Sequence, residues 1–506
     1  MKTAVMICKM KMVLRFHTMI LMKTLQKARI SLHLMPLIRQ IFINREFFLL
    51  IFLLLIFFSL IVLKIYFYYL NYFFIFNYNM SFFNLFKDLN NLIMAKGDIM
   101  SNINVIEGGI CAVQGVRAAG TREGKYGLTV IESKDSNASA VFTSNKVVAA
   151  PIIHTKEMIK GGKISLVVAN SGNANCFTGV DGIADCDKTI KFASDITGIP
   201  SNEIATASTG VIGRKMPMDI ILPLVEESIS KLDHSAESST DAAKSLMTTD
   251  TYHKEFAVET TVNGEKVTIG GITKGVGMIA PNMGTMLCFL ATDAVISAEK
   301  INEALKSAVN KSFNMIVVDG DQSTNDTAIL MANGKSGVEV AENGEINPDF
   351  QEALDFICIS LAKMMARDGE GATKFIECKV NGAKSEEDAI LASKSVISSS
   401  LVKSAIFGGD PNWGRIVAAV GYSGCEMDQN MITVSVSDDN DKESILVDQG
   451  KILAFDGTPE LNLAEEIMQE KNINILVDLY QGDFTATAWG CDLTYDYVKI
   501  NAEYTT

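Results

Sequence analysis

The chain has 506 residues, which is enough for roughly three domains and a large buried core, so a disordered chain and a small disulfide-stapled scaffold are excluded. Its formal net charge is −14, yet residues 1–100 hold 12 basic and 3 acidic residues, whereas the remainder holds 33 and 56. The first hundred residues also contain 14 of the 26 phenylalanines and only one of the 37 glycines. We therefore interpret this leader and the acidic body separately.

The body lacks the clusters of lysine and arginine that phosphate binding needs, so nucleic acid is not an expected partner. The nine cysteines of the chain are scattered singly without a C-x-x-C pair, which argues against a zinc site and against a disulfide framework. We expect a cytoplasmic protein with no metal. Only His154, His234 and His253 follow residue 100, and none lies in a motif-like segment, so catalysis should not depend on an imidazole base.

The leader contains one long apolar run, Phe47–Leu63, which is just able to span a bilayer. Basic residues upstream, up to Arg45, would then place the body outside the cell, which conflicts with the cysteine usage. Met94 and Met100 stand where body-like composition begins, and the residues before them resemble translated AT-rich DNA. We therefore interpret residues 1–93 as lying outside the enzyme, because of a mis-assigned start; a membrane segment is the alternative.

Short apolar runs alternate with helical patterns from about Ile103 onward, which predicts an α/β fold. Strands are expected at Ser165–Asn170, Ile204–Ser208, Phe256–Val262 and Thr285–Ala291. Amphipathic helices are expected after Ser297 and after Asp349. The polar stretch Asn381–Glu387 could separate a smaller C-terminal α/β domain, beginning at about residue 385.

The segment Lys274–Ala291 is the densest unusual feature, since glycines and Pro281 form an irregular loop that ends at Thr285, where a buried strand begins. The ordinary interpretation is a glycine-rich turn before a core strand. The functional one is self-cleavage at Gly284–Thr285, in which the threonine hydroxyl attacks the preceding carbonyl and hydrolysis exposes a new N-terminus. The new α-amino group, with a reference pKa of roughly 7.7 to 8.0, would serve as the base for the hydroxyl.

This segment resembles the self-cleavage segment of the ornithine acetyltransferase (glutamate N-acetyltransferase) family of arginine biosynthesis. Further segments resemble family segments in family order: Val168–Asn175, Ser208–Gly213, Met247–Thr251, Val318–Asp326, Asp368–Thr373, Gly409–Arg415 and Asn501–Thr506. Together they cover about Ile103 to Thr506. The family generally carries alanine where this chain has Gly284, and the residue remains small.

The resemblance implies a layered α/β sandwich of the self-cleaving N-terminal-nucleophile type. It also implies an α chain, residues 94–284, and a β chain, residues 285–506, that stay together in a tetramer of two α and two β chains. Thr285 would be the nucleophile that becomes acetylated. Thr209 and Gly210 would form the oxyanion hole, which the chemistry needs because attack on an amide creates an alkoxide.

By the same resemblance, six positions would bind substrate: Thr248, Lys274, Thr285, Glu370, Asn501 and Thr506. Their chemistry suits an amino acid, because a lysine pairs with an α-carboxylate and a glutamate pairs with an ammonium group. Thr249 and Thr251 leave the register of Thr248 open. Asp319, Asp321 and Asp326 lack the loop spacing of a calcium site, so we expect them in a solvated turn.

The implied reaction moves an acetyl group from N2-acetyl-L-ornithine to L-glutamate without a metal or a bound cofactor. Some family members also acetylate glutamate from acetyl-CoA, and the sequence leaves open whether this chain does. One alternative is a self-cleaving aminopeptidase or amidase of the same architecture, with water as the acceptor. Another is a membrane-anchored binding protein whose glycine-rich loops are only structural.

Overall fold

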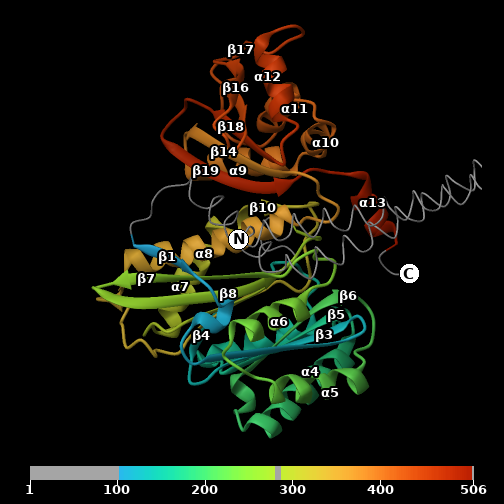
Figure 1. The fold of residues 1–506 in the computed structure, drawn as a ribbon, viewed down its shortest axis with the longest axis vertical. Coiled ribbons are helices and arrows are strands. Elements are labelled where there is room, and N and C mark those ends of the chain that lie inside the picture. Colours follow the sequence, from blue (N-terminus) through green and yellow to red (C-terminus); the bar gives the residue numbers. More distant parts are fainter. Residues whose placement is uncertain (1–101, 280–285, 504–506) are drawn as a thin grey trace, which may run out of the picture. The chain divides into compact units, whose positions relative to one another are not determined.

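The computed structural model describes residues 102–279 and 286–503, which Figure 1 draws in colour. The described residues belong to one compact unit, Ser101–Thr506. The apolar run Phe47–Leu63 lies outside the described residues. No single helix among those described is long and apolar enough to cross a membrane, and one bent pair, Glu386–Ser398 with Ser400–Gly408, reaches that length and composition together.

A six-stranded sheet contains the strand that follows the predicted cleavage point. In spatial order its strands are β1 (Ile103–Ile106), β7 (Lys254–Val262), β8 (Glu265–Lys274), β9 (Leu287–Thr292), β11 (Thr327–Ala332) and β4 (Asn137–Phe142). Neighbouring strands are antiparallel, except that β9 and β11 run parallel. The parallel pair places the starts of β9 and β11 beside each other.

A four-stranded sheet packs against the six-stranded sheet. Its strands, in spatial order, are β2 (Val116–Glu123), β3 (Tyr126–Ser133), β5 (Leu166–Asn173) and β6 (Ile204–Val211). One apolar cluster joins the facing sides of the two sheets, with Val167 and Ala207 from one and Phe289 and Ile329 from the other. β5 and β6 pair in parallel, so their carboxyl ends lie at the same edge of the sheet.

Side chains along β9 alternate between two apolar clusters because successive residues of a strand point to opposite faces. Leu287, Phe289 and Ala291 belong to the cluster between the two sheets, and Cys288 and Leu290 to the cluster on the opposite face. Both faces of the strand are therefore buried. This explains why the sequence of β9 is continuously apolar instead of alternating with polar residues.

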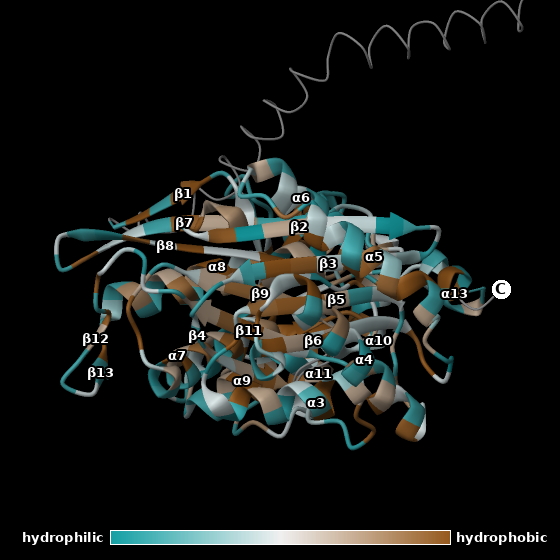
Figure 2. Cartoon of the chain, turned by 90° about the horizontal axis from the view of Figure 1, so that it is seen from below, coloured by the Kyte–Doolittle hydropathy of each residue, from teal (hydrophilic) through white to brown (hydrophobic). Residues whose placement is uncertain are grey.

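Helices cover the outer faces of this pair of sheets, which gives the order helices, sheet, sheet, helices (Figure 1). On the outer face of the four-stranded sheet lie α3 (Ala150–Met158), α4 (Gly179–Thr197) and α5 (Met218–Ser230), and on the six-stranded sheet lie α7 (Ala298–Lys311) and α8 (Pro348–Arg367). Helix α6 (Ala236–Leu246) lies between the two sheets instead, where Ala242, Ala243 and Leu246 belong to the apolar cluster that joins them. Figure 2 shows apolar residues concentrated in the strands of the interior, with polar residues outside. The predicted α/β fold and its layered arrangement are confirmed.

A seven-stranded sheet forms the other part of the unit. Its spatial order is β10 (Ile316–Val317), β19 (Phe484–Cys491), β14 (Phe375–Ala383), β18 (Asn472–Asp478), β15 (Thr433–Ser437), β16 (Glu443–Asp448) and β17 (Lys451–Ile452). The accompanying helices are α9 (Glu386–Ser398), α10 (Ser400–Gly408), α11 (Trp413–Gly421), α12 (Pro459–Ile467) and α13 (Tyr495–Ala502). The sheet draws on β10 and β14, which precede residue 385, as well as on strands that follow it.

The remaining elements are short. They are the hairpin β12 (Ala341–Glu342) with β13 (Glu345–Ile346), and the 3-10 helices η3 (Gly109–Ala112), η4 (Ile159–Gly161), η5 (Ser201–Glu203) and η6 (Phe313–Met315).

The expected strands correspond to β5, β6, β7 and β9, and the expected helices to α7 and α8. The hydroxyl of Ser297 caps α7 by accepting a hydrogen bond from the Lys300 backbone N–H. The second helix begins earlier than expected, because Asn347 and not Asp349 provides its cap and Pro348 occupies the first helical position.

Candidate active site

The predicted oxyanion pair lies at the carboxyl end of β6, beside the end of β5. Thr209 is buried, and Gly210 has a φ of +133°, a conformation that side-chain-bearing residues rarely adopt. A Cβ added to Gly210 would lie 2.4 Å from the carbonyl carbon of Gly172 on β5. Only glycine therefore lets the two strand ends approach this closely.

Lys274 meets Thr209 from the other sheet. It is the last residue of β8, is 3% exposed, and its Nζ lies 3.3 Å from Thr209 Oγ1. Burial lowers the pKa of Lys274 below its usual value, and the nearby Asp250 carboxylate partly offsets this by favouring the ammonium form. The structure thus brings together two predicted site residues that are 65 positions apart in the sequence.

Asp250 holds the loop between α6 and β7 against the end of β8. Its Oδ1 accepts hydrogen bonds from Lys254 Nζ at 2.8 Å and from the Gly275 backbone N–H at 3.0 Å. Its Oδ2 accepts one from the Thr248 backbone N–H at 3.0 Å. Burial alone would raise the pKa of Asp250, but the ammonium groups of Lys274 and Lys254 outweigh it and lower that pKa to about 2.

Lys254 joins two carboxylates in the interior. Its Nζ lies 2.8 Å from Asp250 Oδ1 and 2.6 Å from Asp368 Oδ2, and all three side chains are buried. Asp368 also accepts hydrogen bonds from the backbone N–H and the hydroxyl of Thr251. The sequence pattern by itself predicted no role for these three charged residues. The signal available in the sequence was that both aspartates lie in segments that resemble the family. The structure gives their physical role, because a buried lysine requires a partner of opposite charge.

Glu370 lies in the loop after α8 and is buried. Its Oε1 accepts a hydrogen bond from Thr249 Oγ1 at 2.6 Å, and its Oε2 accepts one from Asn501 Nδ2 at 2.8 Å. A Cβ on Gly277 would lie 2.6 Å from the Glu370 carboxyl group. Two further predicted residues, Glu370 and Asn501, are therefore in contact beside the described part of the glycine-rich loop.

Thr248, Thr249 and Thr251, among which the sequence left the substrate-binding position open, have different contacts in the structure. Thr249 donates to Glu370, and Thr251 donates to Asp368. The half-buried Thr248 makes no side-chain hydrogen bond with the residues that the structure describes, although its backbone N–H binds Asp250. The Thr248 hydroxyl is thus the one of the three not engaged within the described part of the chain.

The expectation of a solvated turn is wrong for Asp326, which is fully buried. Its Oδ1 accepts a hydrogen bond from the Met286 backbone N–H at 2.9 Å, while its Oδ2 has no hydrogen-bond partner among the described residues. Burial raises the pKa of Asp326 well above its ordinary value. The parallel pairing of β9 and β11 is the reason for the burial, because it places Asp326 at the start of β11 beside Met286.

Asp319 does not lie in a simple solvated turn either, because it binds the described end of the glycine-rich loop. Its carboxylate accepts hydrogen bonds from the backbone N–H groups of Met278 at 2.7 Å and Ile279 at 3.0 Å. Burial raises the pKa of Asp319. Within residues 102–279 and 286–503, no group of three or more His, Cys, Asp or Glu side chains is arranged to hold a metal ion.

Three predicted positions, Gly284, Thr285 and Thr506, lie outside the described residues. Met286, which directly follows Thr285 in the sequence, is described, and both of its backbone groups are bound. Its N–H binds Asp326, and its carbonyl accepts a hydrogen bond from the Thr327 backbone N–H at 3.1 Å. The start of β9 is therefore fixed against the start of β11.

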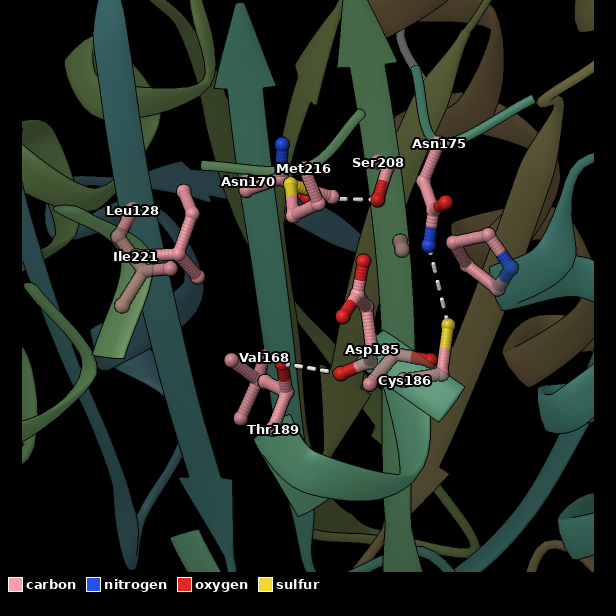
Figure 3. Close-up of a pocket in the computed structure, with 13 residues that line it drawn as sticks. Leu128, Val168, Asn170, Asn175, Asp185, Cys186, Thr189, Ser208, Met216 and Ile221 are labelled. Atoms are coloured by element: carbon pink, nitrogen blue, oxygen red, sulfur yellow. Dashed lines mark hydrogen bonds between the residues drawn. The ribbon is translucent and has the colours of Figure 1, made fainter. Parts of the chain in front are cut away.

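A small pocket lies beside β5 and β6 (Figure 3). Across it, Ser208 Oγ donates to Asn170 Oδ1 at 2.6 Å, and Asn175 Nδ2 lies 3.4 Å from Cys186 Sγ. None of the predicted site residues that the structure describes lines this pocket. It is thus distinct from the predicted site, although Ser208 directly precedes Thr209.

Comparison with known proteins matches residues 113–506 to the model of the ArgJ family. The chain is 52% identical over 405 residues to a glutamate N-acetyltransferase of Methanothermobacter thermautotrophicus, which covers 80% of this chain and 99% of the relative. It is also 52% identical over 408 residues to a glutamate N-acetyltransferase of Methanocaldococcus jannaschii, covering 80% of this chain and all of that relative.

Two solved structures are similar as well. The arginine biosynthesis bifunctional protein ArgJ of Bacillus halodurans is 42% identical, with a TM-score of 0.39, over 42% of this chain and 97% of that one. An ornithine acetyltransferase of Mycobacterium tuberculosis, solved with ornithine, is 32% identical, with a TM-score of 0.33, over 37% of this chain and all of that one.

The family match and the closely related sequences identify the class of the protein: it is an enzyme, an acyltransferase. More particularly, the chain belongs to the ArgJ family, as the ordered segments of the sequence indicated.

Proposed function

We propose that this enzyme transfers the acetyl group of N2-acetyl-L-ornithine to L-glutamate in arginine biosynthesis, through an acetyl ester on Thr285. The observation that carries the proposal is the meeting of Lys274 with Thr209, since these residues come from two sheets and from two family-like segments. The names of the relatives, glutamate N-acetyltransferases that align over nearly their whole length, support the same reaction.

The nucleophile would be made by self-cleavage at Gly284–Thr285. The Thr285 hydroxyl attacks the Gly284 carbonyl carbon, the peptide C–N bond breaks, and the hydroxyl proton passes to the departing nitrogen. Water then hydrolyses the resulting ester, which leaves a carboxylate on Gly284 and a free hydroxyl and α-amino group on Thr285. The proposed products are an α chain of residues 94–284 and a β chain of residues 285–506, with a smaller C-terminal domain from about residue 385.

In the acetyl transfer, the Thr285 α-amino group takes the hydroxyl proton as the oxygen attacks the acetyl carbonyl. The C–N bond to ornithine breaks, and the proton passes to the ornithine amine as it leaves. The glutamate amine then attacks the acetyl ester, and the Thr285 hydroxyl is restored. Thr209 and Gly210 stabilise the oxyanion in both steps, a role whose removal typically costs about 2.7 to 4 kcal/mol of barrier for one donor.

The substrate contacts follow from charge. Lys274 would bind the α-carboxylate, with the Thr248 hydroxyl beside it. Glu370 would bind an ammonium group: Thr249 and Asn501 each donate to one of its oxygens, and a carboxylate has about four acceptor positions in all, so it has capacity for another donor. Thr506 and Thr285 complete the proposed set. We expect no metal or bound cofactor in this reaction.

A self-cleaving aminopeptidase or amidase, in which water replaces glutamate, is the alternative. The contact between Asn501 and Glu370 favours a transferase, because it ties the C-terminal segment, which the family uses to bind its substrate, to the site. Acetylation of glutamate from acetyl-CoA, assembly into two α and two β chains, and a cytoplasmic location are further parts of the proposal.

The experiment is an acetyl-transfer assay on the purified full chain. Intact mass under denaturing conditions, with N-terminal sequencing, should give a fragment that begins at Thr285. Incubation with N-acetylornithine labelled in the acetyl group should yield labelled N-acetylglutamate only when glutamate is present. Labelled acetate, formed at the same rate without glutamate, would support the hydrolase instead, and an uncut chain would contradict the self-cleavage. A parallel incubation with acetyl-CoA decides the second activity.

A further inference from the structure

Asn325 uses its whole side-chain amide in the interior. It lies just before β11 and is buried, and its Nδ2 donates to the carbonyl oxygens of Ser208, at 2.8 Å, and Ala174, at 2.6 Å. Its Oδ1 accepts a hydrogen bond from Thr324 Oγ1 at 2.5 Å. Both carbonyl groups lie close to the oxyanion pair in the fold. Each is more than 100 residues away from Asn325 in the sequence.

The bond to Ser208 fixes more than one carbonyl group. The Ser208 carbonyl and the Thr209 N–H belong to one planar peptide unit and point in opposite directions, so fixing one of them fixes the other. The Ser208 side chain is held as well, because its hydroxyl donates to Asn170 (Figure 3). Asn325 thereby sets the orientation of the peptide that leads into the proposed oxyanion hole.

The next residue, Asp326, performs the corresponding task for the nucleophile strand. Its Oδ1 binds the backbone N–H of Met286, which is joined by a peptide bond to Thr285. The Asp326 carbonyl accepts a hydrogen bond from the Thr143 backbone N–H at 3.1 Å, so its own main chain is held by β4's end. The consecutive residues Asn325 and Asp326 therefore bind the main chain at two places, Asn325 at β6 and Asp326 just before β9.

We propose that Asn325 and Asp326 are positioning residues that set the oxyanion hole against the nucleophile. β6 and β9 belong to different sheets, so no strand pairing fixes their relative register, and the Asn325–Asp326 pair spans the gap. This inference rests on the proposed acetyl transfer. A displacement of about 1 Å between reacting groups can cost roughly 100-fold in rate, so such a brace affects turnover strongly.

The main test uses two variants. Asn325→Ala removes the whole amide group, and Asn325→Asp keeps the size of the side chain but removes the amide donors. For both we expect kcat for acetyl transfer to fall by about 10- to 100-fold. KM for N-acetylornithine should change less than threefold, because Lys274 and Glu370 keep their contacts. Self-cleavage should also slow, as followed by intact mass against time.

Asn333→Ala is the matched control. Asn333 follows the other end of β11, and its Nδ2 also donates to two oxygens, Gln114 O at 2.9 Å and Ser133 Oγ at 3.3 Å, and neither of these partners is a proposed site residue. Its kcat should stay within twofold of the unaltered enzyme. A folded Asn325→Ala or Asn325→Asp enzyme with a kcat like that of the control would overturn the proposal.

A second experiment compares kcat for Asp326→Asn and Asp326→Ala. It tests the positioning role independently if the Asn325 variants do not fold. An asparagine carbonyl can still accept the Met286 N–H, so it should recover at least tenfold of the kcat lost in the alanine variant. Equal loss in both would show that the carboxyl group itself is needed and would overturn a positioning role, and so would an unaffected alanine variant.

The two proposals fail in different ways. If the unaltered full chain is neither cut nor active in acetyl transfer, the proposed function fails before any variant is made. If the unaltered chain is active and the Asn325 and Asp326 variants match the control, only the positioning role fails.

Discussion

Thr285 is the residue on which the proposed chemistry depends, because it would supply both the hydroxyl nucleophile and the amine base. We predict that Thr285→Ala gives one uncut polypeptide with no acetyl transfer, since alanine has no hydroxyl to attack the Gly284 carbonyl. Intact mass and the labelled-acetyl assay check this. A variant that is still processed at the same bond, or still active, would remove Thr285 from the mechanism.

Thr209 carries the second prediction at the scale of a residue. Its hydroxyl contacts Lys274 Nζ and it sits at the proposed oxyanion hole, so Thr209→Ala should preserve the fold and lower kcat by about 100- to 1,000-fold. Maturation should slow too, because self-cleavage passes through a similar oxyanion. Rates are measured on the fully cut fraction, and an unchanged kcat would contradict the oxyanion role.

At the scale of an element, the close approach of β5 and β6 fixes the edge that presents the oxyanion pair. Gly210→Ala should destabilise the protein by more than the roughly 1 to 2 kcal/mol of a left-handed residue, since the new Cβ would also lie 2.4 Å from Gly172. The midpoint of urea unfolding measures this. Gly213→Ala separates the two causes, because Gly213 has a φ of +79° but, its chain neighbours apart, no atom of the described residues lies within 4 Å of the added Cβ.

Equal destabilisation of the Gly210 and Gly213 variants would show that the backbone conformation, and not the contact between the strands, makes glycine necessary at Gly210. The parallel pairing of β9 with β11 has a comparable role on the other sheet. This pairing places Asp326 beside Met286, the residue after the proposed nucleophile, although the two are 40 positions apart in the chain.

At the scale of the whole molecule, two buried aspartates give opposite contributions to the pH dependence of stability. The pKa of Asp326 is raised in the folded state by burial, so the folded protein binds more protons than the unfolded one above about pH 4. Its contribution to stability therefore declines as pH rises from about 4 towards the raised pKa. Asp250, with a folded pKa of about 2, stabilises above about pH 4 and loses that contribution as pH falls through about 2.

We predict that Asp326→Asn, which resembles the protonated carboxyl group, is more stable than the unaltered protein at pH 7.5 and that this difference shrinks towards pH 4. Asp250→Asn should be less stable at pH 7.5, since it leaves Lys254 and Lys274 without that carboxylate, and its deficit should shrink in acid. Urea unfolding at several pH values checks both. Parallel stability curves for the Asp326 variant and the unaltered protein would contradict the prediction.

Local sequence patterns determined the elements and the family. Short apolar runs predicted β5, β6, β7 and β9, and the run of β9 is continuous because that strand is buried on both faces. The spacing of apolar residues after Ser297 predicted α7. The ordered segments from Val168 to Thr506 indicated the family, which the comparison confirms over residues 113–506. Such features depend only on residues that are near one another in the chain.

Only the tertiary structure decided which of these segments meet. Lys274 reaches Thr209, Asn501 reaches Glu370, and Asp326 is buried against Met286 instead of lying in a solvated turn. The physical reason is that burial and pairing of polar groups depend on how the sheets stack, and strands far apart in the sequence supply the partners. No local pattern distinguishes a buried, paired aspartate from an exposed one.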